Sequence, residues 1–564
     1  MKAKSTLSLI VALMLGFLFG SVLEHYFGAA MEGDVGCFDA ISHQMKLGQH
    51  LYSEVYDNKA PGIFYINYLL PELGFNPITS SWILQASCFF ILVFTLRPLL
   101  SQWTMLNSVF GFCAAIFVVF SIRTIVFFWP AFFVGGYTEQ IGTYLLISGF
   151  LLLYQSSFFW TCDKMLNPRY SKLKLLVSGL FIGLTLLIKE PFVFFIPAIT
   201  LWLFFVNRKD VGLWFIGFIS PWLMHAVVLI KNGSYQEYFQ YLRFAVNYGN
   251  AGNNLFSLEK LLNTLQPFQF DSLPVVNVIQ LFVFFVFCFL FIIRWWWNYR
   301  NKSDAPEEKR SFTLILLFTH LLFLWGSRCF GLLGNGNYLH YQIPEYLLSW
   351  LGLVLLFNSI SSYLKRFRNG DNYKAGVLIL GTVAILLISN SIVKKQMPMG
   401  HFSMVQTLKD PHFIHGANYP KLVKVSEEEQ AWNYFLLKNK IKVPERSQIF
   451  IDDPHLGRFY GYLNSQYLTY FPCPYWVFFD GDNLNFNQQA WPFLEQNRNK
   501  IIRQLQEQPP QFVIMGENKG PYATFKELIV FFENNFVKRG EFLLDTKRVL
   551  LYERVHSKLP EDNL

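Results

Sequence analysis

The sequence predicts an α-helical polytopic membrane protein with about 11 transmembrane (TM) helices and a C-terminal extracytoplasmic α/β domain. Three observations predict this class. The 564 residues are 53% hydrophobic and only 15% charged, whereas soluble domains carry about 25% charged residues. Phe alone occurs 61 times. Long apolar runs recur through the first two thirds of the chain and stop before the tail. This composition excludes disordered, collagenous and disulfide-scaffold proteins.

The predicted spans are apolar runs of the length that crosses a bilayer, about 20 residues. They cover residues 7–23, 78–96, 105–122, 138–158, 174–189, 192–206, 211–230, 275–294, 311–327, 341–361 and 374–393. The runs 174–189 and 192–206 are short and are split by Lys189-Glu190-Pro191, which predicts incomplete spans. Residues 1–30 also fit a signal peptide that ends near Ala30, but the length of the first apolar run favours a retained helix.

Basic residues predict the orientation. Lys and Arg cluster in alternate connections, at 164–174, 208–209, 294–310 and 365–368, and the positive-inside rule places these connections in the cytoplasm. Residues 24–77 and 394–564 then face the outside. The net charge of +9 follows from this pattern, so we expect no nucleic acid partner. The predicted location is a bacterial inner membrane, with the C-terminal domain in the periplasm.

Two domains are expected, a transmembrane catalytic domain over residues 1–395 and a soluble α/β domain over residues 396–564. In the tail, a capping box at Ser426 and Glu429 predicts a helix through Asn439. The other expected elements are strands at 449–451, 512–515 and 549–554 and a helix at 523–536. The seven cysteines are scattered along the chain and odd in number, which predicts no disulfide framework.

The first external segment, residues 24–77, carries the strongest functional signal. It mixes acid, base, Gly and Pro in a way that a simple connection between two helices does not need. Asp34 follows the first span closely, and an ionisable residue near the membrane is a functional candidate by default. The alternative for Asp34 is an ordinary solvated carboxylate.

The spacing of this segment resembles the first loop of polyprenyl-phosphate-sugar-dependent glycosyltransferases of the GT-C superfamily, such as protein O-mannosyltransferases and aminoarabinose transferases. The matching patterns are Asp34-x-Gly36-x-Phe38, Gly48-x-x-Leu51-Tyr52 and Asp57-x-Lys59-x-Pro61-Gly62-Ile63. Three further segments resemble the class, namely 135–139 with Glu139, 179–191 with Lys189, and 337–341 with His340 and Tyr341. The arginine that often precedes the His-Tyr pair is absent here, and Arg328 is its candidate substitute.

The resemblance implies that an acceptor hydroxyl attacks the anomeric carbon of a sugar carried on a polyprenyl phosphate. The attack needs a general base, and Asp34 is the candidate. The leaving phosphate needs cations, for which Lys59, Lys189 and Arg328 are the candidates. Glu139 would bind the sugar or acceptor, or share a divalent metal ion with Asp34, while His340 and Tyr341 would line the pocket. The implied partners are this donor, the lipid bilayer and a lipid, glycan or protein acceptor.

Each residue also has a simpler interpretation. Lys59 and Lys189 could extend to the membrane interface, Glu139 could cap its helix, and His340 could be a packing residue. For the whole chain, the alternatives are a transporter or lipid flippase and a ligase that takes an oligosaccharide from a lipid diphosphate. A transporter would carry its ionisable residues near the bilayer midplane, whereas here they gather in the outer segments.

Overall fold

The computed structural model divides into two compact units. Unit 1 comprises Met1–Val22, Ile83–His225 and Asn254–Phe413, and unit 2 comprises Leu23–Trp82, Ala226–Asn253 and Ile414–Leu564. The structure describes residues 34–57, 59–73, 83, 84, 87, 90–92, 94, 95, 138–156, 168–206, 208–249, 432, 434–444, 446–451, 457, 459–472, 491–516, 526–544 and 547–555.

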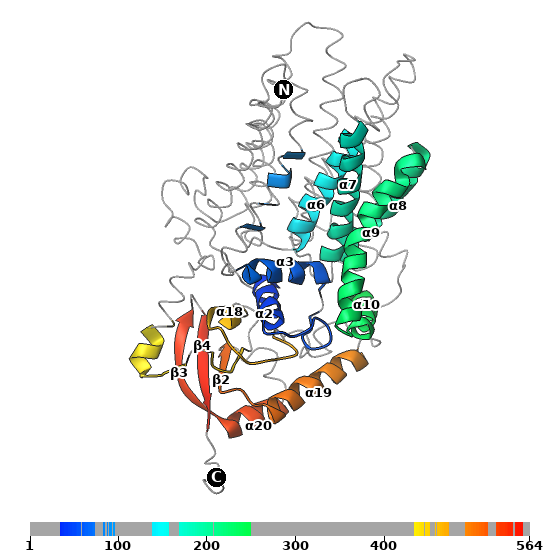
Figure 1. Cartoon of the computed structure of the whole chain (residues 1–564). Coiled ribbons are helices and arrows are strands. Elements are labelled where there is room, and N and C mark those ends of the chain that lie inside the picture. The colour runs from blue at the N-terminus through cyan, green and yellow to red at the C-terminus, as the bar shows by residue number, and fades with distance from the viewer. Residues whose placement is uncertain are drawn as a thin grey trace, which may run out of the picture. The chain divides into compact units, whose positions relative to one another are not determined.

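The described part of unit 1 is helical (Figure 1). Its elements are α6 (Thr138–Gln155), α7 (Pro168–Ile188), the 3-10 helix η2 (Glu190–Phe194), α8 (Phe195–Val206) and most of α9 (Arg208–Lys231). They coincide with the predicted spans 138–158, 174–189, 192–206 and 211–230, which are confirmed as helices. Among the described residues, Val211–Lys231 is the helix long and apolar enough to cross a membrane.

The break that the sequence predicts at Lys189-Glu190-Pro191 is present. Lys189 has an extended backbone, with φ −152° and ψ 113°, and η2 begins at the next residue. Proline has no amide hydrogen and disfavours a helical residue before it, so α7 ends here. Of the other predicted spans, 78–96 is described only in part, and 7–23, 105–122, 275–294, 311–327, 341–361 and 374–393 lie outside the described residues.

Helices α7 and α9 touch through their backbones. A Cβ atom at Gly179 would lie 2.1 Å from the carbonyl oxygen of Trp214, and one at Gly183 would lie 2.2 Å from that of Phe218. On α9, a Cβ atom at Gly217 would lie 2.1 Å from the carbonyl oxygen of Leu176. Small residues four apart let membrane helices approach this closely, so the glycines set the distance between the two helices.

Helix α6 packs as tightly against α7. The hydroxyl of Ser178 donates a hydrogen bond to the carbonyl of Gly149 at 2.7 Å, and that of Thr185 donates to the carbonyl of Gly142 at 3.3 Å. These bonds replace water as partners for buried hydroxyl groups. Helices α6 and α7 are thereby held in fixed register along their length.

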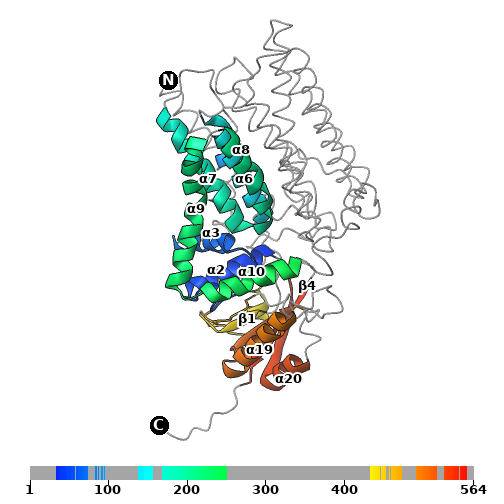
Figure 2. The same cartoon turned by 90° about the vertical axis from the view of Figure 1, so that its right-hand side faces the viewer.

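Unit 2 combines the first external segment, the end of α9 with the following helix, and the tail. Its helices are α2 (Asp34–Lys46), α3 (Pro61–Glu72), α10 (Tyr235–Gly249), α18 (Phe459–Tyr462), α19 (Trp491–Glu507) and α20 (Lys526–Asn535). Its strands are β1 (Ile449–Ile451), β2 (Phe512–Gly516), β3 (Phe536–Leu544) and β4 (Lys547–Arg554). The strands form one sheet in the order β1-β2-β4-β3, with helices α19 and α20 beside it (Figure 2).

The sheet confirms the strands expected at 449–451, 512–515 and 549–554. Strand β1 pairs in parallel with β2, and β4 pairs in antiparallel fashion with both β2 and β3. Helix α20 lies within the helix expected at 523–536. The helix expected up to Asn439 is present over 434–439 and ends at the predicted residue, whereas its capping box at Ser426 and Glu429 lies outside the described residues.

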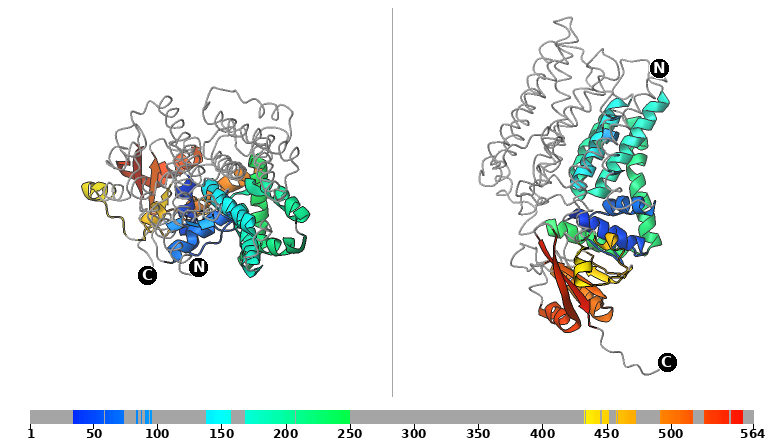
Figure 3. Two further views of the ribbon diagram at one scale, coloured as in Figure 1. Left: turned by 90° about the horizontal axis from the view of Figure 1, so that it is seen from above. Right: turned by 90° about the vertical axis from the view of Figure 1, so that its left-hand side faces the viewer.

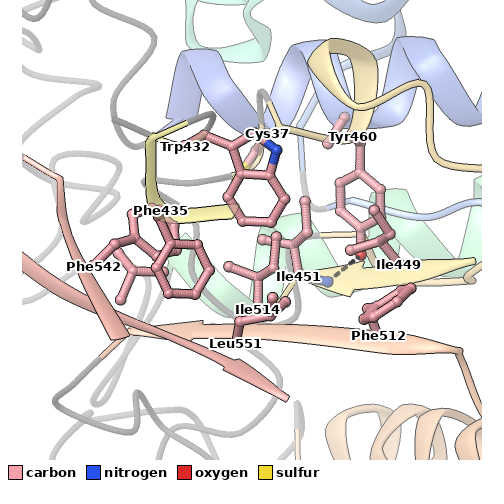
Figure 4. Close-up of a cluster of buried hydrophobic side chains, with 12 residues drawn as sticks. Cys37, Trp432, Phe435, Ile449, Ile451, Tyr460, Phe512, Ile514, Phe542 and Leu551 are labelled. Atoms are coloured by element: carbon pink, nitrogen blue, oxygen red, sulfur yellow. Dashed lines mark hydrogen bonds between the residues drawn. The ribbon is translucent and has the colours of Figure 1, made fainter. Parts of the chain in front are cut away.

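One face of the sheet shares its hydrophobic core with α2 from the first external segment. Cys37 and Ala40 of α2 are buried in one cluster with ten residues of the tail: Trp432, Phe435, Ile449, Ile451, Tyr460, Phe512, Ile514, Phe542, Val549 and Leu551 (Figure 4). Helix α18 lies beside α2 (Figure 3). A Cβ atom at Gly457 would come within 2.7 Å of the carbonyl oxygen of Gly36. The tail's core is therefore completed by a helix that precedes Trp432 by about 390 residues.

Cys37 is disulfide-bonded, so the prediction of no disulfide framework is wrong for this residue. Regular cysteine spacing indicates disulfide bonds in short chains, whereas a disulfide bond between distant segments leaves no such spacing. Cys473 falls in the ranges of unit 2, whereas the other five cysteines fall in those of unit 1.

We expect Cys37 to be joined to Cys473. Mass spectrometry of peptides prepared without reductant should recover the two cysteines in one linked species that separates after reduction. Recovery of Cys37 as a free thiol, or linked to another cysteine, would contradict this pairing.

Candidate functional site

In unit 1, the structure brings two of the candidate residues into contact. The ammonium group of Lys189 lies 2.7 Å from Oε1 of Glu139, and the two side chains are only 14% and 5% exposed. The hydroxyl of Thr138 donates a hydrogen bond of 2.9 Å to Oε2 of the same carboxylate. Glu139 is therefore a buried carboxylate that binds a cation through one oxygen and a hydroxyl through the other.

Helix ends explain why these residues occupy these positions. Glu139 is in the first turn of α6, where the helix dipole favours an acid, and Lys189 follows the last residue of α7, where it favours a base. The backbone amide of Lys189 still donates to the carbonyl of Thr185 at 3.0 Å. Because α6 and α7 are held in register, their charged ends meet.

The pair has a definite chemical capacity. A carboxylate beside an ammonium group can accept hydrogen bonds from hydroxyl groups such as those of a sugar. The ammonium group of Lys189 places a positive charge at the same position.

In unit 2, Asp34 and Lys59 belong to one folded segment. Asp34 is the first residue of α2, and Lys59 stands two residues before Pro61, where α3 begins. Asp57 between them is buried, with 2% of its surface exposed. Proline at the first helical position fixes the backbone direction, so the Asp57-x-Lys59-x-Pro61 pattern forms a rigid entry to α3.

Tyr52 supports this entry. Its hydroxyl donates to the carbonyl oxygen of Lys59 at 3.1 Å, and its side chain is fully buried. Its backbone lies in the left-handed region, with φ 74°, a conformation that costs about 1 kcal/mol or more in a residue other than glycine. The ring stacks on Tyr241 of α10, with 4.9 Å between the centroids. Packing against α10 stabilises this backbone conformation.

A cluster of aromatic rings joins the first external segment to the tail. Tyr56 stacks on Tyr470 at 5.9 Å and contacts Phe471 and Phe493. The amide of Tyr56 donates to the carbonyl of Tyr470 at 2.8 Å, and the hydroxyl of Tyr470 donates to the carbonyl of Tyr52 at 3.1 Å. Burial raises the pKa of both phenols, so both remain neutral at physiological pH.

Helix α2 is also hydrogen-bonded to the tail. The side-chain amide of Gln44 donates to the carbonyl of Tyr467 at 3.0 Å and its oxygen accepts from the amide of Thr469 at 3.3 Å. Nε2 of His43 lies 2.7 Å from the carbonyl oxygen of Ser465, so this nitrogen carries the proton. The helix that begins at Asp34 is fixed on the tail by polar as well as apolar contacts.

Acidification should lower the stability of the fold through His43. Burial lowers the pKa of His43 below its usual 6.5, with a smaller contribution from Lys46, and outweighs the hydrogen bond to Ser465, which raises it. The unfolded chain therefore binds a proton at a higher pH than the folded one, so stability falls as the pH drops through about 6.5. We expect the melting temperature in detergent to fall less between pH 8 and pH 5.5 for His43→Gln than for the wild type. An equal fall for both proteins would contradict this.

The remaining sequence candidates are not placed together by the described residues. Arg328, His340 and Tyr341 lie outside them. No group of three or more His, Cys, Asp or Glu side chains that could hold a metal ion occurs in the described part of the chain. The divalent metal ion shared by Asp34 and Glu139 stays a prediction.

Sequence reasoning missed two kinds of supporting residue. The contact of Tyr52 with the backbone of Lys59 was not expected, although Leu51-Tyr52 belongs to the motif. The tail residues Tyr470 and Phe471 were not connected with the first external segment at all. The run of aromatic residues Tyr467, Tyr470 and Phe471 in a polar tail was an available signal for a buried contact.

No protein-family model and no curated protein sequence matches the chain. Among solved structures, it is similar to ArnT from Cupriavidus metallidurans bound to undecaprenyl phosphate. The TM-score is 0.46 at 12% identity, over 96% of this chain and 98% of that one. It is also similar to the archaeal oligosaccharyltransferase AglB from Archaeoglobus fulgidus in complex with an inhibitory peptide and a dolichol-phosphate. There the TM-score is 0.42 at 12% identity, over 98% of this chain and 75% of that one.

Proposed function

We propose that this protein is an integral membrane glycosyltransferase that moves a sugar from a polyprenyl-phosphate-linked donor to a lipid, glycan or protein acceptor at the outer face of the membrane. The observation that carries the proposal is the pattern of residues 34–63, built as one segment in which Asp34 opens α2 and Lys59 lies in the rigid entry to α3. A passive connection between two spans would not need a buried acid, a lysine fixed through its backbone and two short helices.

In the proposed reaction, Asp34 accepts the proton of the acceptor hydroxyl while its oxygen attacks the anomeric carbon. The bond between that carbon and the phosphate oxygen breaks, and the electron pair leaves with the polyprenyl phosphate. Lys59, Lys189 and Arg328 stabilise the charge of the phosphate. Glu139 binds sugar or acceptor hydroxyl groups. A single displacement of this kind inverts the configuration at the anomeric carbon.

Two observations support the outer face of a membrane as the place of this reaction. Disulfides persist in oxidising compartments, and Cys37 of α2 is disulfide-bonded. The helix Val211–Lys231 is long and apolar enough to span a bilayer, and several of its apolar side chains are exposed: Phe215, Ile216, Leu223, Met224, Val227 and Ile230. We include in the proposal a bacterial inner membrane with residues 34–73 and the tail in the periplasm.

The test is sugar transfer in membranes from a panel of radiolabelled polyprenyl-phosphate sugars, with wild type and Asp34→Asn compared at equal folded amounts. General base catalysis contributes about a hundredfold to ten-thousandfold, so we expect the variant to lose transfer by a factor in that range. The matched control is Asp39→Asn on the same helix, which should retain activity.

Equal transfer by wild type and Asp34→Asn would keep the reaction class and remove Asp34 from its role. If the folded wild type transferred no sugar from any donor to native acceptors, the proposed function would be wrong. Transport assays in vesicles would then test the transporter alternative.

A further inference from the structure

Helix α10 has two faces of different character. Tyr238, Tyr241 and Phe244 are buried, and they pack against Tyr52 of the first external segment and Phe493 of α19. The opposite face is open, with Phe239 66% exposed. It carries Tyr235, Gln236, Phe239, Gln240 and Arg243 and no acid.

Helix α10 follows closely after the end of α9. Val227 and Ile230 in the last turns of α9 are largely exposed, Ile230 by 73%. The helix ends at Lys231, and a turn with Gly233 at φ 67° redirects the chain before α10 begins at Tyr235. Four residues of chain reach at most about 14 Å. The start of α10 is therefore near the level at which the apolar face of α9 ends.

The open face of α10 has the chemistry of a membrane interface. Tyr and other aromatic side chains are enriched where the hydrocarbon meets the headgroups. Interfacial helices combine apolar residues with basic residues that reach anionic groups. Phe239 and Tyr235 are four residues apart and so share one face, while Arg243 continues that face toward the end of the helix.

We propose that α10 is an interfacial helix whose open face, with Tyr235, Phe239 and Arg243, rests in the headgroup layer of the outer leaflet. The bilayer is the occupant because α10 begins within about 14 Å of the end of α9, whose exposed apolar side chains are proposed to lie in the membrane. Phe239 enters the boundary between headgroups and acyl chains, and Arg243 binds lipid phosphate.

The position of α10 at the membrane also matters for the candidate site. This consequence rests on the proposed function. The buried face of α10 stacks Tyr241 on Tyr52, and Tyr52 holds the carbonyl of Lys59. A helix lying on the headgroups would thus fix the height of Lys59 relative to the layer in which a lipid-linked phosphate is found. Helix α10 acts as a positioning element, and no residue of its open face touches the reacting atoms.

The test is photo-crosslinking of the full chain in bilayer nanodiscs of phosphatidylethanolamine and phosphatidylglycerol, without donor or acceptor. The photoreactive residue benzoylphenylalanine replaces Phe239 in one variant and Tyr235 in a second. In the control variants it replaces Ile230, on α9, or Leu437, which is 79% exposed in the tail. Intact mass spectrometry after irradiation counts the lipid adducts.

We expect lipid adducts from positions 230, 235 and 239 and no lipid adducts from position 437. Lipid adducts at 230 but not at 235 or 239 would overturn the proposal, as would adducts to a second copy of the chain at 239. Because the measurement needs no turnover, a negative result would leave the proposed glycosyl transfer standing. Lipid adducts at 235 and 239 would support the interfacial position of α10 even if the protein proved not to transfer sugar.

Discussion

Replacing Lys189 with Met is expected to lower the free energy of unfolding by about 3–5 kcal/mol, the usual effect of breaking a buried ion pair. The change leaves the carboxylate of Glu139, which is 5% exposed and accepts a hydrogen bond from Thr138, without the cation that lies 2.7 Å from it. Denaturant or thermal unfolding of the purified protein in detergent measures the effect. Lys231→Met is the matched control, because Lys231 also ends a helix but is exposed.

The double variant Lys189→Met with Glu139→Gln separates stability from chemistry. It removes both charges, so it should recover most of the stability that the single variant loses. Under the proposed function, the double variant should fold yet fail to transfer sugar. A stable double variant with full activity would show that the pair only joins α6 to α7. A single variant as stable as the wild type would contradict the ion pair itself.

Adding one methyl group to Gly183 is expected to destabilise the protein by about 3 kcal/mol, at the upper end of the range for overpacking. The new Cβ atom would lie 2.2 Å from the carbonyl oxygen of Phe218. This neighbour is backbone and cannot turn aside, so α7 and α9 must separate. The yield of folded protein and its melting temperature in detergent measure the loss.

Gly212→Ala on α9 is the control, since no atom lies within 4 Å of a Cβ added there. This change should be neutral, or stabilising by about 0.5–1 kcal/mol, because alanine favours a helix over glycine. Equal stability of the Gly183→Ala and Gly212→Ala variants would show that α7 and α9 do not approach as closely as the structure has them.

The sheet of the tail was predictable where local patterns decide the structure. The apolar triplet Ile449–Ile451 and the strand at Phe512 lie where the sequence placed them. Strand β3 was missed because Lys538, Arg539 and Gly540 resemble a turn. In the structure a register shift between Lys538 and Gly540 lets the strand continue. Helix α19 was missed because its composition is polar, although its buried residues Leu494, Ile501 and Leu505 follow the helical spacing.

The helices of the first external segment were not predictable from local pattern. Helix α2 gains its stability from Cys37 and Ala40 in the core of the tail, and contacts between residues so distant along the chain leave no periodic signal. The same limit applies to the site. The sequence identified Glu139 and Lys189 separately at helix ends, but which charges meet depends on the register of α6 on α7.

The shared core of α2 and the tail also sets the order of events during synthesis. Residues 34–46 are made early, whereas Trp432 follows after about 390 further residues and strand β4 after about 500. At about 5–20 residues per second, the ribosome needs roughly 20–80 s to reach Trp432. During that time Cys37 and Ala40 lack the tail residues that bury them, whereas Phe38 can already pack on Phe64 of α3. This early helix therefore reaches its final packing only after the tail has been made.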